Sequence, residues 1–232
     1  MRISEIFYSI QGEGTLTGVP SVFVRTSGCN LRCHWCDTPY TSWKPEGKTM
    51  SVDEVVAEVR TYRANHVVLT GGEPMIARDI VELSQKLANH GMHITIETAG
   101  TVAAPVACDL MSISPKLHNS TPLVTEQTSP EDAKWSVQHE KTRYAPGVLR
   151  RLIQDYPYQL KFVVSSPEDL KEVNQIISDI RADPNHVLLM PEGTDENLLR
   201  ERSQWVAEIC KESGYRFTTR LHVSIWGNKR GI

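Results

Sequence analysis

Short apolar segments recur along the chain and alternate with segments of helical character, and this alternation is the strongest constraint on the fold. The apolar segments lie at 21–25, 66–70, 93–97, 110–114, 160–164 and 186–190. Nearly continuous apolar strands that alternate with helices are typical of a parallel sheet covered by helices. Because crossovers in such sheets are right-handed, six of these units predict an α/β fold, a partial (β/α)6 TIM-like barrel. We expect residues 1–232 to form a single domain.

Residues between these segments carry the usual signals of helix starts and loops. Ser51-Val52-Asp53-Glu54 is a capping box ahead of a helix that we expect to end near Tyr62. The other expected elements are a strand at 3–10, helices at 79–90 and 195–213, a helix that starts at residues 166–169 (Ser-Pro-Glu-Asp), and a last strand at 216–222. Gly214 is expected to end the helix at 195–213. Residues 118–146 lose the periodicity and predict a surface excursion, with a short helix after Ser129-Pro130-Glu131.

Composition limits the partners and the location that we expect for the protein. The 232 residues include 25 basic and 28 acidic side chains, for a net charge of −3 with histidine neutral. A broad basic face for nucleic acid would need an excess of positive charge, so we expect no direct nucleic-acid partner. No run approaches the roughly eighteen apolar residues of a membrane span, and the first residues lack the apolar region of a signal peptide. The sequence therefore predicts a cytoplasmic protein with no membrane attachment.

Three of the five cysteines, Cys29, Cys33 and Cys36, fall within eight residues. Cysteine thiolates usually hold every iron of a [4Fe–4S] cluster, so three cysteines would leave one iron free to bind a small molecule. A zinc site is the alternative, with His34 as a fourth ligand. Structural zinc sites, however, usually draw four ligands from paired motifs. The spacing favours an iron–sulfur cluster and leaves zinc open.

Unusual loops follow the carboxyl ends of several predicted strands. Residues 71–74 (Gly-Gly-Glu-Pro) expose backbone groups, residues 114–116 (Ser-Pro-Lys) offer a hydroxyl and an ammonium, and Glu97 offers a carboxylate. Any one of them alone could be an ordinary turn. In β/α barrels the loops at the carboxyl ends of the strands meet on one face and carry the active site. We therefore expect these loops to converge with the cysteine segment.

Together these motifs resemble a known family over nearly the whole chain. The segment Cys29-x3-Cys33-x2-Cys36-Asp37-Thr38 resembles the cluster loop of radical S-adenosylmethionine (SAM) enzymes. Further motifs narrow the resemblance to the 7-carboxy-7-deazaguanine synthase family of queuosine and 7-deazapurine biosynthesis. They are Gln11-Gly12-Glu13-Gly14, Thr70-Gly71-Gly72-Glu73-Pro74, Glu97-Thr98, Ser114-Pro115-Lys116 and Trp226-Gly227-Asn228-Lys229-Arg230-Gly231. The resemblance implies a barrel of the radical SAM type and a lyase that converts 6-carboxy-5,6,7,8-tetrahydropterin to 7-carboxy-7-deazaguanine by ring contraction, losing ammonia.

The resemblance also implies cofactors and site residues. The cofactors would be a [4Fe–4S] cluster on Cys29, Cys33 and Cys36, SAM, and Mg²⁺ on the Thr38 hydroxyl. Because the radical would derive from SAM, no side chain is expected as the catalytic group. SAM would be bound by Trp35, Cys36, Asp37, Gly72, Ser114, Pro115, Lys116, Met190, Pro191, Glu192 and Gly193. The pterin would be bound by the backbone of Ile10, Gln11 and Gly12, by Arg25 and Thr70, and by the C-terminal carboxylate of Ile232.

The same resemblance implies a homodimer and an electron donor such as a flavodoxin, with the small pterin as substrate. It leaves open whether His222 contacts the substrate or packs in the core. Two other functions remain compatible with the residues. One is a glycyl-radical activase, which would share the cluster and SAM but act on a protein. The other is a non-catalytic zinc or iron–sulfur binding module.

Overall fold

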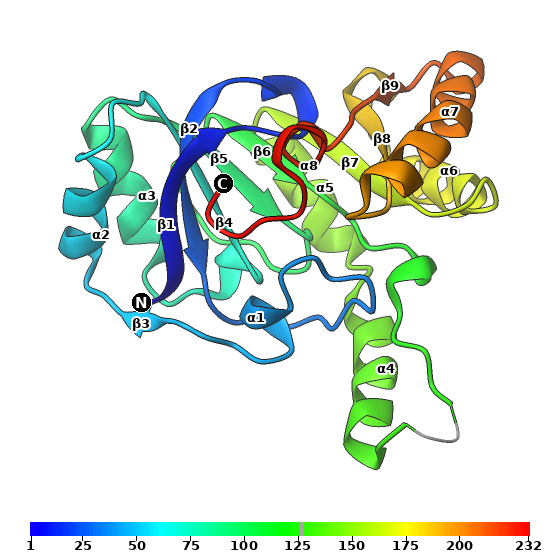
Figure 1. Cartoon of the computed structure of the whole chain (residues 1–232), viewed down its shortest axis with the longest axis horizontal. Helices are drawn as coiled ribbons and strands as arrows, with labels where there is room; N and C mark the ends of the chain where they lie inside the picture. Colours follow the sequence, from blue (N-terminus) through cyan, green and yellow to red (C-terminus); the bar gives the residue numbers. More distant parts are fainter. Residues whose placement is uncertain (126–127) are drawn as a thin grey trace.

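A single curved sheet forms the centre of the molecule (Figure 1). In the part of the chain that the computed structural model describes, residues 1–125 and 128–232, nine strands pair in the order β3-β1-β2-β4-β5-β6-β7-β8-β9. The strands are β1 (Arg2–Ile10), β2 (Pro20–Thr26), β3 (Lys48–Thr49), β4 (His66–Gly71), β5 (His93–Thr98), β6 (Leu110–Ile113), β7 (Tyr158–Val164), β8 (Val187–Pro191) and β9 (Arg216–Phe217). Neighbours from β2 to β9 are parallel, whereas β1 is antiparallel to β2 and β3. The predicted partial barrel is confirmed, with β2, β4, β5, β6, β7 and β8 as its six strands.

Helices flank this sheet, and most of them lie between consecutive parallel strands. They are α1 (Pro39–Ser42), α2 (Val52–Val59), α3 (Ile80–Asn89), α4 (Pro130–Thr142), α5 (Pro146–Asp155), α6 (Asp169–Ile180), α7 (Glu196–Ser213) and α8 (Leu221–Trp226). Short 3₁₀ turns are η1 (Gly14–Leu16), η2 (Pro74–Ile76), η3 (His118–Ser120) and η4 (Pro184–His186). Helix α2 packs on α3, α5 on α6, and α7 on β8. The connection from β5 to β6 departs from the pattern, because residues 99–109, all of which are described, form no helix.

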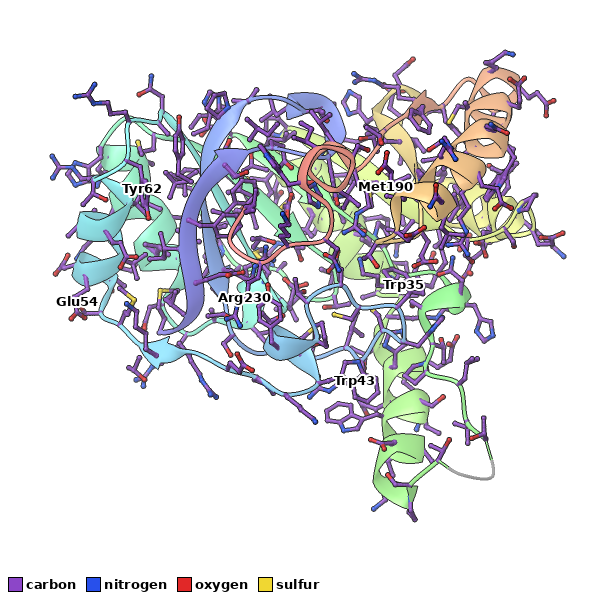
Figure 2. The ribbon with its side chains drawn as sticks, in the orientation of Figure 1. Trp35, Trp43, Glu54, Tyr62, Met190 and Arg230 are labelled. Atoms are coloured by element: carbon purple, nitrogen blue, oxygen red, sulfur yellow. The ribbon has the colours of Figure 1, made fainter. Side chains whose placement is uncertain are left out.

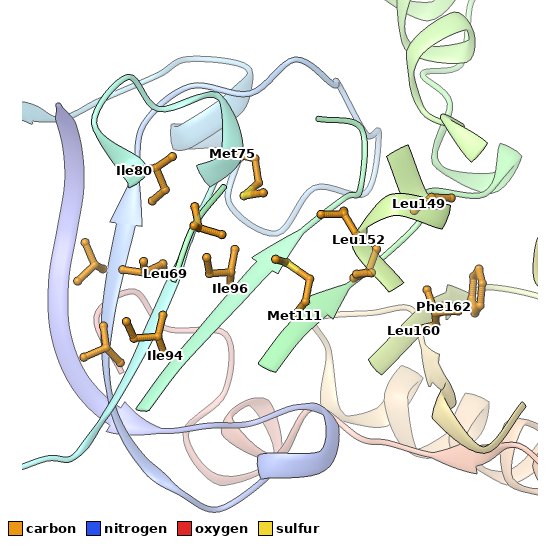
Figure 3. Close-up of a cluster of buried hydrophobic side chains, with 14 of the residues drawn as sticks. Leu69, Met75, Ile80, Ile94, Ile96, Met111, Leu149, Leu152, Leu160 and Phe162 are labelled. Carbon is orange, nitrogen blue, oxygen red and sulfur yellow. The ribbon is translucent and has the colours of Figure 1, made fainter. Parts of the chain in front are cut away.

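The core fills the space between the sheet and the helices. Figure 3 shows Leu69, Ile96 and Met111 side by side on adjacent strands, with Leu152 of α5 and Ile80 of α3 against them. These five side chains are at most 2% exposed. Burying one such side chain stabilises a fold by about 1.5–3 kcal/mol. This packing therefore fixes the strands, and with them the loops at their carboxyl ends.

The expected helix signals appear in the structure. Ser51 and Glu54 form the reciprocal capping box at the start of α2. Asp195 accepts from the first backbone N–H groups of α7, and Gly214 ends this helix with φ of 72°, a conformation that glycine adopts without strain. In the described residues, no helix is both long enough and apolar enough to cross a membrane.

The last predicted strand is wrong beyond residue 217. Strand β9 ends at Phe217, and residues 221–226 form helix α8 instead of continuing to His222. Pairing with β8 ends because the chain turns inward, where Leu221 N donates to Gly12 O at 2.9 Å. This turn also carries the buried Arg220 to an acidic partner in the interior, a contact between distant residues that strand propensity does not anticipate.

The excursion at 118–146 contains more structure than expected. Helix α4 has thirteen residues, begins with a proline in its first turn and is capped by Ser129, whose Oγ accepts from Asp132 N. Figure 1 shows α4 projecting away from the barrel. Residues 126–127 of this segment lie outside the described residues.

Candidate functional site

Two pockets open at the carboxyl ends of the parallel strands and share one wall. We name the pocket that contains the three cysteines the cluster-side pocket, and the pocket that contains the C-terminal residues the tail-side pocket. Residues that line both make up the shared wall; they are Glu13, Asp37, Thr38, Thr70, Gly71, Glu97 and Arg220.

The two pockets collect most of the residues expected from the sequence. Of the residues expected to bind SAM, the cluster-side pocket is lined by Trp35, Cys36, Asp37, Gly72, Ser114, Lys116, Met190, Glu192 and Gly193. Pro115 and Pro191 are not among its lining residues. Of the residues expected to bind substrate, the tail-side pocket is lined by Ile10, Gln11, Gly12, Arg25, Thr70 and Ile232. Figure 2 shows the labelled Trp35 and Met190 in the same region of the molecule.

The cysteine segment, residues 29–36, runs directly after β2, and its three thiols line the cluster-side pocket without forming disulfides. Backbone Leu31 N donates to Cys29 Sγ at 3.3 Å, and Trp43 Nε1 donates to Cys33 O at 3.0 Å. Burial raises the pKa of the Cys29 thiol to about 11 and the pKa of the Cys33 thiol to about 12. Metal binding requires thiolates, so loading a metal here releases protons.

Glycine allows the loop after β4 to approach the cysteine segment. A Cβ atom on Gly72 would lie 2.1 Å from Gly28 O, so only glycine fits at this position without a shift. The adjacent Glu73 is buried and accepts from Thr98 Oγ1 and Ala99 N, both at 2.8 Å. Its carboxylate therefore joins the loops after β4 and β5 and does not face a ligand.

A charge network, which the sequence did not reveal, crosses the shared wall; Lys161 and Arg220 are buried, whereas Asp37 is 37% exposed. Glu13 pairs with Lys161 and, at 3.0 Å, with Arg220 Nε, and Arg220 also pairs with Asp37. The Arg220 Nη1 donates to Gly193 O at 2.7 Å. Burial alone would raise the pKa of the Glu13 carboxyl, but the charges of Lys161 and Arg220 lower it on balance. Two acids and two bases thus form a compact and formally neutral group.

One sequence signal could have identified part of this network. Lys161 lies inside β7, a strand of otherwise buried side chains apart from its first residue, and is itself 6% exposed. Lysine is almost never buried unless it is paired. A lysine within an apolar strand is therefore a signal for a buried acidic partner, although it does not identify Glu13.

The tail-side pocket has a second polar wall. Glu97 accepts from Gln11 Nε2 at 3.1 Å and from Thr70 Oγ1 at 2.9 Å. Arg25 donates through Nε to Glu5 Oε1 at 2.6 Å. This contact does not use the two Nη groups of its guanidinium, which can still donate to a ligand. The backbone of Gln11 is engaged within the fold, because its N–H donates to Val19 O and its carbonyl accepts from Gly18 N.

The C-terminal residues Asn228–Ile232 line the tail-side pocket. The apolar Ile225, which precedes them in α8, is 50% exposed. Arg230 is the anchor: it pairs with Glu5 and Glu46, and its guanidinium lies 4.0 Å from the centre of the Tyr40 ring.

His222 and Thr38 both line the tail-side pocket. The His222 ring lies so close to Gly12 that a Cβ on this glycine would be 2.0 Å from Nδ1. His222 thus lines the pocket and is not a core residue. Thr38 lies on the shared wall, with Oγ1 3.8 Å from Cys36 Sγ and 3.5 Å from Thr41 Oγ1. Among the residues described, no three His, Cys, Asp or Glu side chains are arranged to hold one metal ion.

Known proteins resemble the chain in both sequence and fold. Residues 23–122 match the Radical SAM superfamily. The 7-carboxy-7-deazaguanine synthase of Halobacterium salinarum is 49% identical, over 98% of this chain and 91% of that protein. The 7-carboxy-7-deazaguanine synthase of Rhodopirellula baltica is 44% identical, over 100% of this chain and 88% of that protein. The crystal structure of QueE from Escherichia coli is 26% identical and aligns with a TM-score of 0.68, over 95% of this chain and 94% of that one.

Proposed function

The chain belongs to the 7-carboxy-7-deazaguanine synthase family of radical SAM enzymes, and from this premise we propose how its two pockets serve the reaction. The enzyme converts 6-carboxy-5,6,7,8-tetrahydropterin to 7-carboxy-7-deazaguanine by radical ring contraction, with loss of ammonia. The observation that carries the assignment of the pockets is the shared wall, since it places the pocket lined by the three cysteines directly beside the tail-side pocket.

The cluster-side pocket suits the [4Fe–4S] cluster and SAM that membership of the radical SAM family implies. Cys29, Cys33 and Cys36 would hold the cluster, because all three are free thiols on one pocket. When bound, the cluster and SAM supply the carbon radical that takes a hydrogen atom from the substrate. Backbone groups at Gly72, with Ser114 and Lys116, would bind SAM from the opposite loops.

The tail-side pocket suits an anionic pterin. The Nη groups of Arg25 would pair with the substrate carboxylate, a geometry that guanidinium favours. Glu97 and the carboxylate of Ile232 would accept from the amino and ring N–H groups of the pyrimidine edge. His222 lies against Gly12 in the same pocket and would contact the bound ring system.

The charge network would keep the two ligands in fixed relation. Glu13, Lys161 and Arg220 satisfy one another within the wall, and Asp37 pairs with Arg220 at its solvent-accessible edge. Removing Glu13 would leave the buried Lys161 without its partner, which typically costs about 3–5 kcal/mol. We therefore assign this group to positioning and to exclusion of water.

We further propose that Thr38 binds Mg²⁺. Its hydroxyl is an oxygen donor of the kind that Mg²⁺ prefers, and it faces both pockets. Because no trio of ionisable ligands surrounds this position in the described residues, the remaining ligands would be substrate oxygens and water. Mg²⁺ commonly keeps several waters in enzyme sites.

The remaining partners follow from family tendency and from the chemistry. We propose a homodimer in the cytoplasm, with a small electron-transfer protein such as a flavodoxin as the source of the electron that the radical step consumes. A glycyl-radical activase would need room for a peptide loop. The chain's own C-terminal residues line the pocket in which that loop would bind, which favours the small pterin.

Anaerobic turnover tests the proposal. The reconstituted enzyme is incubated with SAM, a reductant, Mg²⁺ and the carboxypterin, and the products are identified by mass spectrometry. The expected products are 7-carboxy-7-deazaguanine and ammonia. A protein that binds the cluster and cleaves SAM yet leaves the carboxypterin unchanged would refute the assignment of the tail-side pocket.

A further inference from the structure

We propose that the turn η3 and helix α4, which we call the brace, position the cysteine segment, and that His139 is the positioning residue. The brace comprises His118–Ser120 and Pro130–Thr142. The inference rests on the cluster-binding part of the proposed function and not on the pterin reaction.

Helix α4 buries a histidine side chain. Among the side chains of α4 that the structure describes, His139 alone is buried, at 0% exposure, whereas the apolar Val137 is 57% exposed. A surface helix normally buries an apolar stripe against the core. A helix that instead buries one imidazole has a role other than filling the core.

The hydrogen bonds of His139 lead directly to the cysteine segment. Backbone Arg32 N, one residue before Cys33, donates to His139 Nδ1 at 3.1 Å. Because Nδ1 accepts, the proton of the neutral ring is on Nε2, which then donates to Ser120 Oγ at 2.9 Å. Ser120 Oγ in turn donates to Leu117 O at 2.6 Å. The chain of donors has one direction, and only a neutral imidazole completes it.

The turn η3 holds the same segment from a second side. His34 N donates to Ser120 O at 3.0 Å, and Trp35 Nε1 donates to Asn119 O at 2.9 Å. Asn119 is fixed to the barrel, since its Nδ2 donates to Asp169 Oδ2 at 2.8 Å. The middle of the cysteine segment therefore rests on a turn that is itself tied to α6.

Arg32 completes the contact. Its guanidinium lies 3.9 Å from the ring centre of Trp135 on α4. The same guanidinium donates through Nη1 to the carbonyls of Cys29 and Leu31, both at 2.8 Å. The brace thus contacts both the backbone and the side chain of Arg32, which lies between Cys29 and Cys33 in the sequence.

Iron retention by the reconstituted enzyme tests this role. In His139→Leu the Arg32 N–H loses its acceptor, and we expect iron release to an external chelator to be about tenfold faster, equivalent to about 1.4 kcal/mol. His139→Asn places an amide oxygen near the position of Nδ1 and should restore the rate to within about twofold of wild type, since an acceptor is again present. Ser136→Ala is the matched control, because Ser136 on the same helix donates to Pro122 O and not to the cysteine segment.

A second readout does not involve the cluster. Hydrogen exchange of the Arg32 amide in the cluster-free chain should be about tenfold faster in His139→Leu and unchanged in Ser136→Ala. If His139→Leu fails to fold, Trp135→Leu serves instead. Loss of the cation–π contact between Arg32 and Trp135 should speed iron release roughly two- to fivefold, equivalent to about 0.5–1 kcal/mol.

Three results would overturn the proposal. They are a wild-type rate of iron release in the His139→Leu or Trp135→Leu variant, failure of His139→Asn to restore retention, and equally fast release in Ser136→Ala. Failure of the proposed function would look different, because a wild-type enzyme that retains its cluster but does not convert the carboxypterin leaves these rates intact.

Discussion

Arg230 holds the C-terminal residues over the tail-side pocket, and Arg230→Met removes that attachment. Its Nε lies 3.1 Å from Glu5 Oε2 and its Nη1 lies 3.0 Å from Glu46 Oε2. The guanidinium also stacks on Tyr40. Methionine replaces the aliphatic part of the side chain but makes none of these polar contacts. The carboxylate of Ile232 would then spend less time at the pocket.

The structure sets the size of the expected effect. Arg230 is 46% exposed and Glu46 58%, so their pair contributes at most about 1 kcal/mol. Glu5 is 13% exposed, so its pair is screened less by solvent. An exposed cation–π contact contributes about 0.5–1 kcal/mol. We take the sum as roughly 1.5–2.5 kcal/mol, which corresponds to a roughly ten- to sixtyfold weaker hold on the tail.

The assay is anaerobic steady-state turnover with the carboxypterin varied. We expect KM for the carboxypterin to rise by up to that factor, with KM for SAM unchanged, because the tail lines only the tail-side pocket. Lys211→Met is the matched control, since it removes an exposed pair with Glu208 on α7 and should change neither KM. A carboxypterin KM within about twofold of wild type in Arg230→Met would refute the reasoning that Arg230 positions the tail.

Four further outcomes are expected. Cys33→Ala should abolish release of 5′-deoxyadenosine while circular dichroism shows the barrel intact; full SAM cleavage would end the cluster assignment. Thr38→Ala should weaken the dependence of turnover on Mg²⁺ with the cluster absorbance retained, and a magnesium titration equal to wild type would exclude this role. A tag after Ile232 should raise the carboxypterin KM one to two orders of magnitude, for a charge-assisted bond of about 1.5–3 kcal/mol, whereas a tag before Met1 should not; equal kinetics would remove Ile232 from the site. Burial, with the nearby Arg143 charge, lowers the pKa of His139 to about 4 in the folded protein. As the pH drops from about 6.5 to 4, this histidine is therefore protonated in the unfolded chain before it is protonated in the folded one. The free energy of unfolding should fall by at most about 3 kcal/mol over that range. Urea unfolding should show this loss in the wild-type protein and a smaller one in His139→Asn; equal losses would contradict it.

Local sequence determined the features that depend on neighbouring residues. The capping box at Ser51 and the glycine end of α7 at Gly214 need only a few adjacent side chains, and both appear where the sequence predicts them. The cysteine spacing and the glycines at residues 71–72 are local in the same sense. Alternation of strands and helices sufficed for the barrel, because parallel strands with right-handed crossovers bring all carboxyl ends to one face.

Features that need residues from distant parts of the chain were not predictable. Glu13 and Arg220 are 207 residues apart in sequence, and Lys161 belongs to a third segment, yet the three meet at one wall. The inward turn that brings Arg220 there also ends β9 and replaces the expected strand with α8. A buried charge stabilises only when its partner is present, so the choice between strand and helix at residues 218–226 was made by tertiary contacts.

The brace shows the same division between local and tertiary information. The sequence determined that a helix follows Ser129 and Pro130, through an N-cap and a proline in the first turn. Which face of this helix is buried could not be predicted, because α4 carries no apolar stripe that points to a core. His139 is buried because the backbone N–H of Arg32, once removed from water, requires an acceptor. The cysteine spacing thus predicted which residues would bind the metal, and only the tertiary structure decided which residues position that segment.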